Sequence, residues 1–129
     1  MGKGKIVYQG TIPINPISKK NSQEIRINQK TGKRFPAQNK RYEQYEHDSG
    51  YFLKPLKEPI NFPVNLKCVF HRATRHRVDL SNLIEAIQDI LVKYGILKDD
   101  NHNIVKSLDG CEVVVGSSSP RTEIEITEV

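Results

Sequence analysis

The stretch VDLSNLIEAIQDILVKYGILKDD, residues 78–100, combines an amphipathic helix with carboxylates on both sides of it. We predict a helix over residues 81–94, with Ser81 as its N-cap and Gly95 as the residue that ends it. Apolar side chains recur at spacings of three and four, so we expect one face of this helix in the core. The members of that face are Leu83, Ile87, Ile90, Leu91 and Tyr94.

Acidic residues accompany this helix along its polar side. They are Asp79, Glu85, Asp89, Asp99 and Asp100. Glu85 and Asp89 form a narrow polar stripe with Asn82, and a chain that folds back after Gly95 would bring the last two acids to the same place. Carboxylates this close repel one another unless water or cations separate them, and oxygen-rich clusters suit Mg²⁺ or Mn²⁺. The alternative is that these acids are solvated and that Asp79 only serves the start of the helix.

These residues resemble the RusA family of Holliday-junction resolvases, which is common in prophages. The similar pattern is Asp79-Leu80-Ser81-Asn82-Leu83, then Asp89, Gly95 and the pair Asp99-Asp100. The resemblance implies a small dimeric α/β endonuclease that requires Mg²⁺, for which Mn²⁺ substitutes, and that cuts branched DNA. It also implies that Asp79 matches the first metal-binding aspartate of the family, and that Asp100, with Asp99 beside it, matches the later one.

Two positions depart from the family pattern. Ser81 stands where the family usually has a second aspartate, and Glu85 stands where it has a functional lysine. We favour the interpretation that Glu85 replaces the missing ligand, because Mg²⁺ accepts any oxygen that reaches about 2.0–2.1 Å. The metal-binding set is then Asp79, Glu85, Asp99 and Asp100, with Asp89 beside them. The alternative is a weakened or inactive protein that binds branched DNA without cutting it.

Composition favours a polyanionic partner. The 129 residues suffice for one domain, spanning 1–129, and carry a net charge of +5. The two cysteines, Cys68 and Cys111, each read as a small buried residue in a reducing compartment. No apolar run reaches the length of a membrane span or a signal peptide, so we expect a cytoplasmic protein without a membrane partner.

Basic residues gather in three segments that we expect to bind DNA phosphates. The first is a turn-rich loop whose Ser-Lys-Lys-Asn-Ser sequence is similar to a segment of RusA proteins. The second is a predicted hairpin over residues 24–36, with its turn at 30–33, and the third is the loop 71–77 just before Asp79. The candidate DNA-binding residues are Lys19, Lys20, Asn21, Lys33, Arg34, Arg72, Arg75 and Arg77. The alternative for each segment is a solvated surface, and for the third we favour a functional role because it lies next to the acids.

The remaining pattern predicts an α/β or α+β fold, a mixed sheet of about five strands with two helices packed on it. Strands are expected at 5–14 and 63–72, and closing strands at 103–108, 112–115 and 122–126. Asp109-Gly110 resembles a hairpin turn between the first two closing strands. The other helix is expected over 39–56, interrupted at Gly50. Its partly buried face would comprise Tyr42, Tyr45, Phe52 and Leu53.

Three functions remain open on the sequence alone. A nuclease acting on Holliday junctions is the first, and it would be a homodimer because two strands must be cut symmetrically. A DNA-binding protein without nuclease activity is the second, and a structural protein whose acidic helix docks a basic partner is the third. Metal-dependent cleavage separates the first from the others, and salt-dependent binding to branched DNA separates the second from the third.

Overall fold

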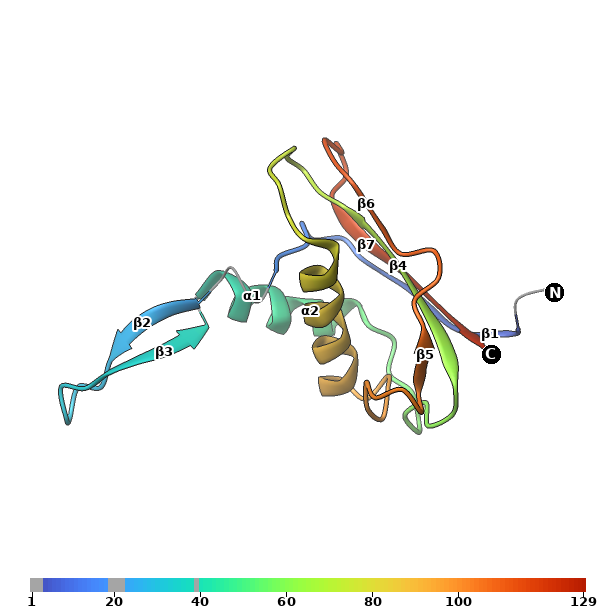
Figure 1. Cartoon of the computed structure of the whole chain (residues 1–129), viewed down its shortest axis with the longest axis horizontal. Helices are drawn as coiled ribbons and strands as arrows, with labels where there is room; N and C mark the ends of the chain where they lie inside the picture. The colour runs from blue at the N-terminus through green and yellow to red at the C-terminus, as the bar shows by residue number, and fades with distance from the viewer. Residues whose placement is uncertain (1–3, 19–22, 39) are drawn as a thin grey trace.

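The computed structural model of the chain describes residues 4–18, 23–38 and 40–129. Two α-helices and a mixed five-stranded sheet lie within these ranges, which confirms the expected α+β class (Figure 1). A separate antiparallel pair, β2 and β3, extends away from the main sheet. The elements are β1 (Ile6–Ile12), β2 (Gln23–Ile27), β3 (Arg34–Gln38), α1 (Lys40–Ser49), the 3₁₀ turn η2 (Gly50–Phe52), β4 (Val64–His71), α2 (Leu80–Lys93), β5 (Val105–Ser107), β6 (Glu112–Val114) and β7 (Arg121–Glu128).

The main sheet is built around β4 and β7. These two strands pair antiparallel over their whole length, and β1 continues the sheet on the far side of β7. The predicted alternation of β4 is confirmed, because Val64, Leu66, Cys68 and Phe70 are buried while the residues between them are half-buried. One face of the sheet therefore carries the core, and α2 packs on that face (Figure 1).

The predicted hairpin at Asp109-Gly110 is wrong. Strands β5 and β6 do not pair with each other in the described structure; each pairs parallel with β4, β5 at its start and β6 at its end. Asn65 of β4 holds the intervening segment, because its Oδ1 accepts the Ser107 hydroxyl at 2.6 Å and the Asp109 amide at 2.8 Å. Its Nδ2 donates to the Asp109 carbonyl at 3.1 Å. These three hydrogen bonds hold the segment between β5 and β6 in a conformation that keeps both strands on the same edge of β4.

Helix α2 confirms the predicted buried face at Leu83, Ile87, Ile90 and Leu91, whereas Tyr94 is only half-buried. The predicted end at Gly95 is confirmed, but the predicted start is not. Asp79 is the N-cap, and Ser81 lies inside the first turn, because the Asp79 carbonyl already accepts the amides of Asn82 and Leu83. Gly95 has φ +75°, and its amide donates to the Val92 carbonyl at 3.1 Å. This left-handed residue turns the chain sharply at the end of the helix.

The first helix ends at Ser49, and the expected interruption at Gly50 is a change to the tighter turn η2. Tyr42, Tyr45 and Leu53 are buried as predicted, whereas Phe52 is 47% exposed, contrary to the prediction. The 3₁₀ turn has three residues per turn instead of 3.6, which rotates Phe52 off the face that Tyr42 and Tyr45 share.

The β2–β3 hairpin is confirmed. Its turn is closed by Asn28, whose Oδ1 accepts the amides of Lys30 at 2.9 Å and Thr31 at 3.2 Å. The ion pair between Arg26 and Glu43, 2.9 Å apart, connects the hairpin to α1. Across the described ranges, no helix combines the length and the apolar composition needed to cross a membrane.

Candidate functional site

Asp79 stands between the basic loop and the first turn of α2. Its backbone caps the helix, but its carboxylate does not bond the helix amides. Instead one carboxylate oxygen accepts the side-chain amide of Asn82 at 3.3 Å, and the residue is exposed. The acidic group at the start of α2 therefore faces solvent rather than serving as a cap.

Asp99 and Asp100 follow the other end of α2. An isolated parallel β-bridge between Leu97 and Ile60 anchors this segment. The Lys98 amide donates to the Ile60 carbonyl at 2.9 Å. Asp99 is engaged locally, because its Oδ1 accepts the Asp100 amide at 2.7 Å. Partial burial raises the pKa of Asp100, and the nearby carboxylates of Asp99 and then Asp89 raise it further. Asp89 and Asp100 thus share one acidic neighbourhood at this end of the helix.

Within one chain, Asp79 lies at the opposite end of α2 from Asp99 and Asp100. Asp79 immediately precedes α2 and Asp100 follows it, and the segment after α2 leaves from the end of the helix opposite the loop that precedes it (Figure 1). The 14 residues of α2 rise by about 21 Å at 1.5 Å per residue. No three acidic, histidine or cysteine side chains converge on a possible metal position anywhere in the described ranges. The expected gathering of five carboxylates does not occur within one chain.

Glu85 and Asp89 lie between those two ends on α2. Ser81, Glu85 and Asp89 follow one another at intervals of four residues, so they form one row, with Glu85 about 6 Å along the axis from each. Glu85 is exposed and Asp89 half-buried. The row approaches α1, where burial, helped by the charges of Glu46, Asp89 and Glu85, raises the pKa of Tyr42. Sequence reasoning assigned Tyr42 only to the core, and no local pattern signals its proximity to the acids.

The basic loop is held against β6 and the segment after it. The Arg72 amide donates to the Val114 carbonyl at 2.8 Å, and the Arg72 guanidinium donates to the His76 carbonyl at 2.9 Å. The guanidinium of Arg75 lies over Gly116, where any β-carbon would come within 3.3 Å of Nη2. Arg75 and Arg77 are exposed and lie four and two positions before Asp79. The loop therefore presents positive charge beside the acidic start of α2.

The other predicted DNA contacts are more distant from this loop or are not described. Lys33 and Arg34 are exposed at the far part of the β2–β3 hairpin (Figure 1). The predicted contacts at Lys19, Lys20 and Asn21 lie outside the described residues.

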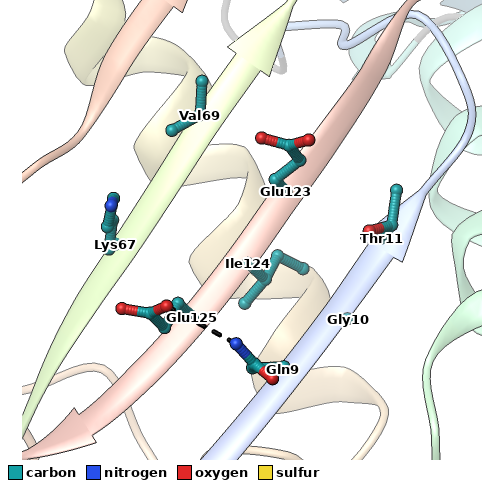
Figure 2. A pocket seen from close by; sticks show the side chains of 8 residues that line it. All are labelled: Gln9, Gly10, Thr11, Lys67, Val69, Glu123, Ile124 and Glu125. Carbon is teal, nitrogen blue, oxygen red and sulfur yellow. Dashed lines mark hydrogen bonds between the residues drawn. The ribbon is translucent and has the colours of Figure 1, made fainter. Parts of the chain in front are cut away.

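A surface depression of about 460 Å³ lies elsewhere. Figure 2 shows it on the open face of the sheet, where Gln9, Lys67, Glu123 and Glu125 stand on three neighbouring strands with α2 behind them. Gln9 donates to Glu125 across the strands at 3.5 Å. None of the candidate acids or arginines lines this depression, so we do not associate it with the predicted site.

The chain combines an α+β fold and net positive charge with an arginine loop and a row of acids. These features are typical of proteins that bind nucleic acid phosphates. The family model described as Endodeoxyribonuclease RusA matches residues 13–127. The chain belongs to the RusA family of endodeoxyribonucleases, whose nucleases are generally metal-dependent. No curated protein matches the chain.

Proposed function

We propose that the protein is a Mg²⁺-dependent endodeoxyribonuclease that cuts Holliday junctions or other branched DNA as a homodimer. The family match over residues 13–127 carries this proposal. The exposed Asp79 and Asp100 support it, since both occupy the positions of the family's acidic pattern. Arg75 and Arg77, exposed beside Asp79, are suited to binding the phosphates that flank a cleavage position.

The acids of one chain do not fit a single metal ion. Oxygen ligands of Mg²⁺ lie about 2.1 Å from the ion, so two of them are separated by no more than about 4 Å. The helix rises by about 15 Å between Asp79 and Asp89, and Asp100 lies in the neighbourhood of Asp89. We therefore propose that a dimer forms the site, with Asp79 of one chain meeting Asp99 and Asp100 of the second. A two-fold arrangement with α2 helices side by side and antiparallel has this property, and it forms two equivalent sites.

The second candidate is a protein that binds branched DNA without cutting it. Ser81 and Glu85 favour this function, because they remove one family carboxylate and replace the family lysine by an acid. In that case the basic loop would still hold phosphates, and the acids of α2 would be solvated. DNA binding is thus common to both candidates, and cleavage separates them.

Cleavage of a synthetic four-way junction across a Mg²⁺ titration, paired with a gel-shift assay, tests the proposal. Wild type should cut only with the metal, whereas Asp79→Asn and Asp100→Asn should bind the junction but lose cleavage. Each substitution keeps the side-chain shape and removes one charge, so binding serves as the internal control. Full cleavage by either variant would remove that residue from the site. Metal-independent binding without cleavage by wild type would establish the second candidate.

A further inference from the structure

The two cysteines lie side by side on neighbouring strands. Strands β4 and β6 are parallel with Val69 opposite Glu112, so Cys68 and Cys111 are the preceding pair of the same register. Adjacent strands are about 4.8 Å apart, within the range of Cα separations that a disulfide spans. The two thiols also hydrogen-bond each other. The sequence-based interpretation treated them as two separate buried residues, and it did not place them together.

The Cys111 thiol fills a gap in the ladder of β4. On this edge of β4, pairing with β5 ends at Asn65 and pairing with β6 begins at Val69. The backbone groups between them that point away from β7 therefore have no strand partner in the described structure. The Cys111 Sγ accepts the Cys68 amide at 3.3 Å and donates to the Leu66 carbonyl at 3.3 Å. Cys111 is therefore held at the edge of the sheet, half-buried, directly beside the fully buried Cys68.

The two thiols differ in acidity. The hydrogen bond from the Cys68 thiol, followed by that from the Cys68 amide, lowers the pKa of Cys111 to about 7 against the opposing effect of burial. The Lys67 ammonium lowers it slightly and the Asp109 carboxylate raises it slightly. The same thiol–thiol bond and complete burial raise the pKa of Cys68. An accessible, acidic thiol next to a second thiol is the arrangement found in reversibly oxidised cysteine pairs.

We propose that Cys111 and Cys68 form an oxidation site for peroxides, in which Cys111 is the attacking thiol and Cys68 the resolving thiol. The Cys111 thiolate attacks one oxygen of hydrogen peroxide, forming the sulfenic acid and releasing hydroxide. The Cys68 thiol then attacks the sulfenic sulfur, and one water leaves as the disulfide forms. The peroxide is the two-electron oxidant, and the two thiols supply the electrons.

Oxidation changes the edge of β4. In the disulfide the Cys111 Sγ carries no hydrogen, so it can no longer donate to the Leu66 carbonyl, and its bond to the Cys68 sulfur at about 2.05 Å draws it away from the Cys68 amide. Those two backbone groups then depend on water, which loosens the gap between β5 and β6. The oxidised form loses hydrogen bonds that the reduced form has, so a dithiol reductant should restore the reduced protein readily.

The experiment treats the reduced full-length chain with hydrogen peroxide and follows the intact mass after acid quench. Wild type should lose the mass of two hydrogen atoms as a monomeric species, and dithiothreitol should restore the starting mass. Cys68→Ser should instead gain one oxygen at Cys111, which dimedone captures. Cys111→Ser should react at least about tenfold more slowly, since its remaining thiol is buried and of raised pKa. The rate for wild type should rise with pH through about 7, the pKa of Cys111.

Several outcomes would overturn the proposal. They are retention of both thiols by wild type, a disulfide between two chains, and accumulation of sulfinic acid without a disulfide. Equal rates for wild type and Cys111→Ser would remove Cys111 as the attacking thiol. Amide exchange at Cys68 provides a measurement on wild type alone, because it should accelerate on oxidation and return on reduction. Unchanged exchange in a protein that has lost two hydrogen atoms would contradict the proposed change at β4.

Discussion

The ring of Tyr94 lies directly against the backbone of Gly50, so the end of α2 meets the junction of α1 and η2 with no side chain between them. The Tyr94 hydroxyl donates to the Glu46 carbonyl at 3.0 Å, and Lys93 forms an ion pair with the Glu46 carboxylate at 2.8 Å. These contacts fix α1 beside the acidic row of α2. The packing at Gly50 consequently supports the candidate site.

Gly50→Ala should lower the free energy of unfolding by about 1–3 kcal/mol, the usual cost of forcing an extra methyl group into a packed contact. The new methyl would overlap the Tyr94 ring, so the helices must separate. Urea denaturation measures the change. Gly10→Ala is the matched control, because a β-carbon there meets Tyr8 at an ordinary contact distance of 3.4 Å. Equal stability of Gly50→Ala and wild type would contradict the observed contact.

Asp100→Asn should raise the melting temperature of the metal-free protein at neutral pH. Burial and the charges of Asp99 and Asp89 raise the pKa of Asp100 above its usual 3.8, so the fold favours its protonated form. Stability from this group is complete below that usual value and is lost as the pH rises through the raised pKa. The gain from Asp100→Asn should therefore vanish in stronger acid. Melting curves across pH test this, with Glu58→Gln as an exposed control.

Arg75→Ala combined with Arg77→Ala should weaken junction binding and reduce its salt dependence. Losing two phosphate contacts should change the slope of log K against log salt by about 1.8, at about 0.9 per contact. Arg72→Ala adds to the effect but also removes the bond to the His76 carbonyl, so the exposed pair gives the cleaner measurement. Lys5→Ala with Lys57→Ala removes equal charge elsewhere. An unchanged slope would exclude the arginines from the DNA interface.

A mixture of Asp79→Asn and Asp100→Asn chains should recover cleavage that neither variant has alone. If each site takes Asp79 from one chain and Asp100 from the other, a mixed dimer has one intact site. Random exchange makes half of the dimers mixed, which restores about one quarter of the sites. Nicking of a labelled junction after refolding the two variants together measures this recovery. A site formed within one chain predicts no recovery, because every site would then lack one aspartate.

The elements of this fold follow from local patterns, but their assembly does not. The period of α2 and the alternation of β4 are visible in the sequence because each depends on residues close together in the chain. The parallel placement of β5 and β6 depends on the Asn65 side chain, which acts on residues more than 40 positions away. The location of Asp100 depends likewise on the bridge between Ile60 and Leu97. Such long-range contacts leave no periodic signal in the sequence. The sequence therefore identified the candidate acids one by one, but it did not predict that they lie apart in one chain.

Glu85→Gln decides whether this residue replaces the carboxylate that Ser81 lacks. Glu85 is exposed and stands one turn beyond Ser81 on the same row of α2, within the reach of a glutamate side chain from the usual ligand position. If Glu85 is a ligand, Glu85→Gln should reduce cleavage about as much as Asp79→Asn and raise the Mg²⁺ concentration needed for half-maximal rate.

Restoring the family pattern provides the matched control for this test. Ser81→Asp with Glu85→Lys should retain or recover cleavage, because the carboxylate returns to its usual position and the family lysine is present. Ser81→Asp alone adds a charge beside the existing acids and should help less. Single-turnover junction cleavage across a Mg²⁺ titration compares these variants with wild type. A fully active Glu85→Gln protein with unchanged Mg²⁺ dependence would show that Glu85 is a solvated helix residue. An inactive wild type that the double variant activates would instead show that Ser81 and Glu85 disable the site.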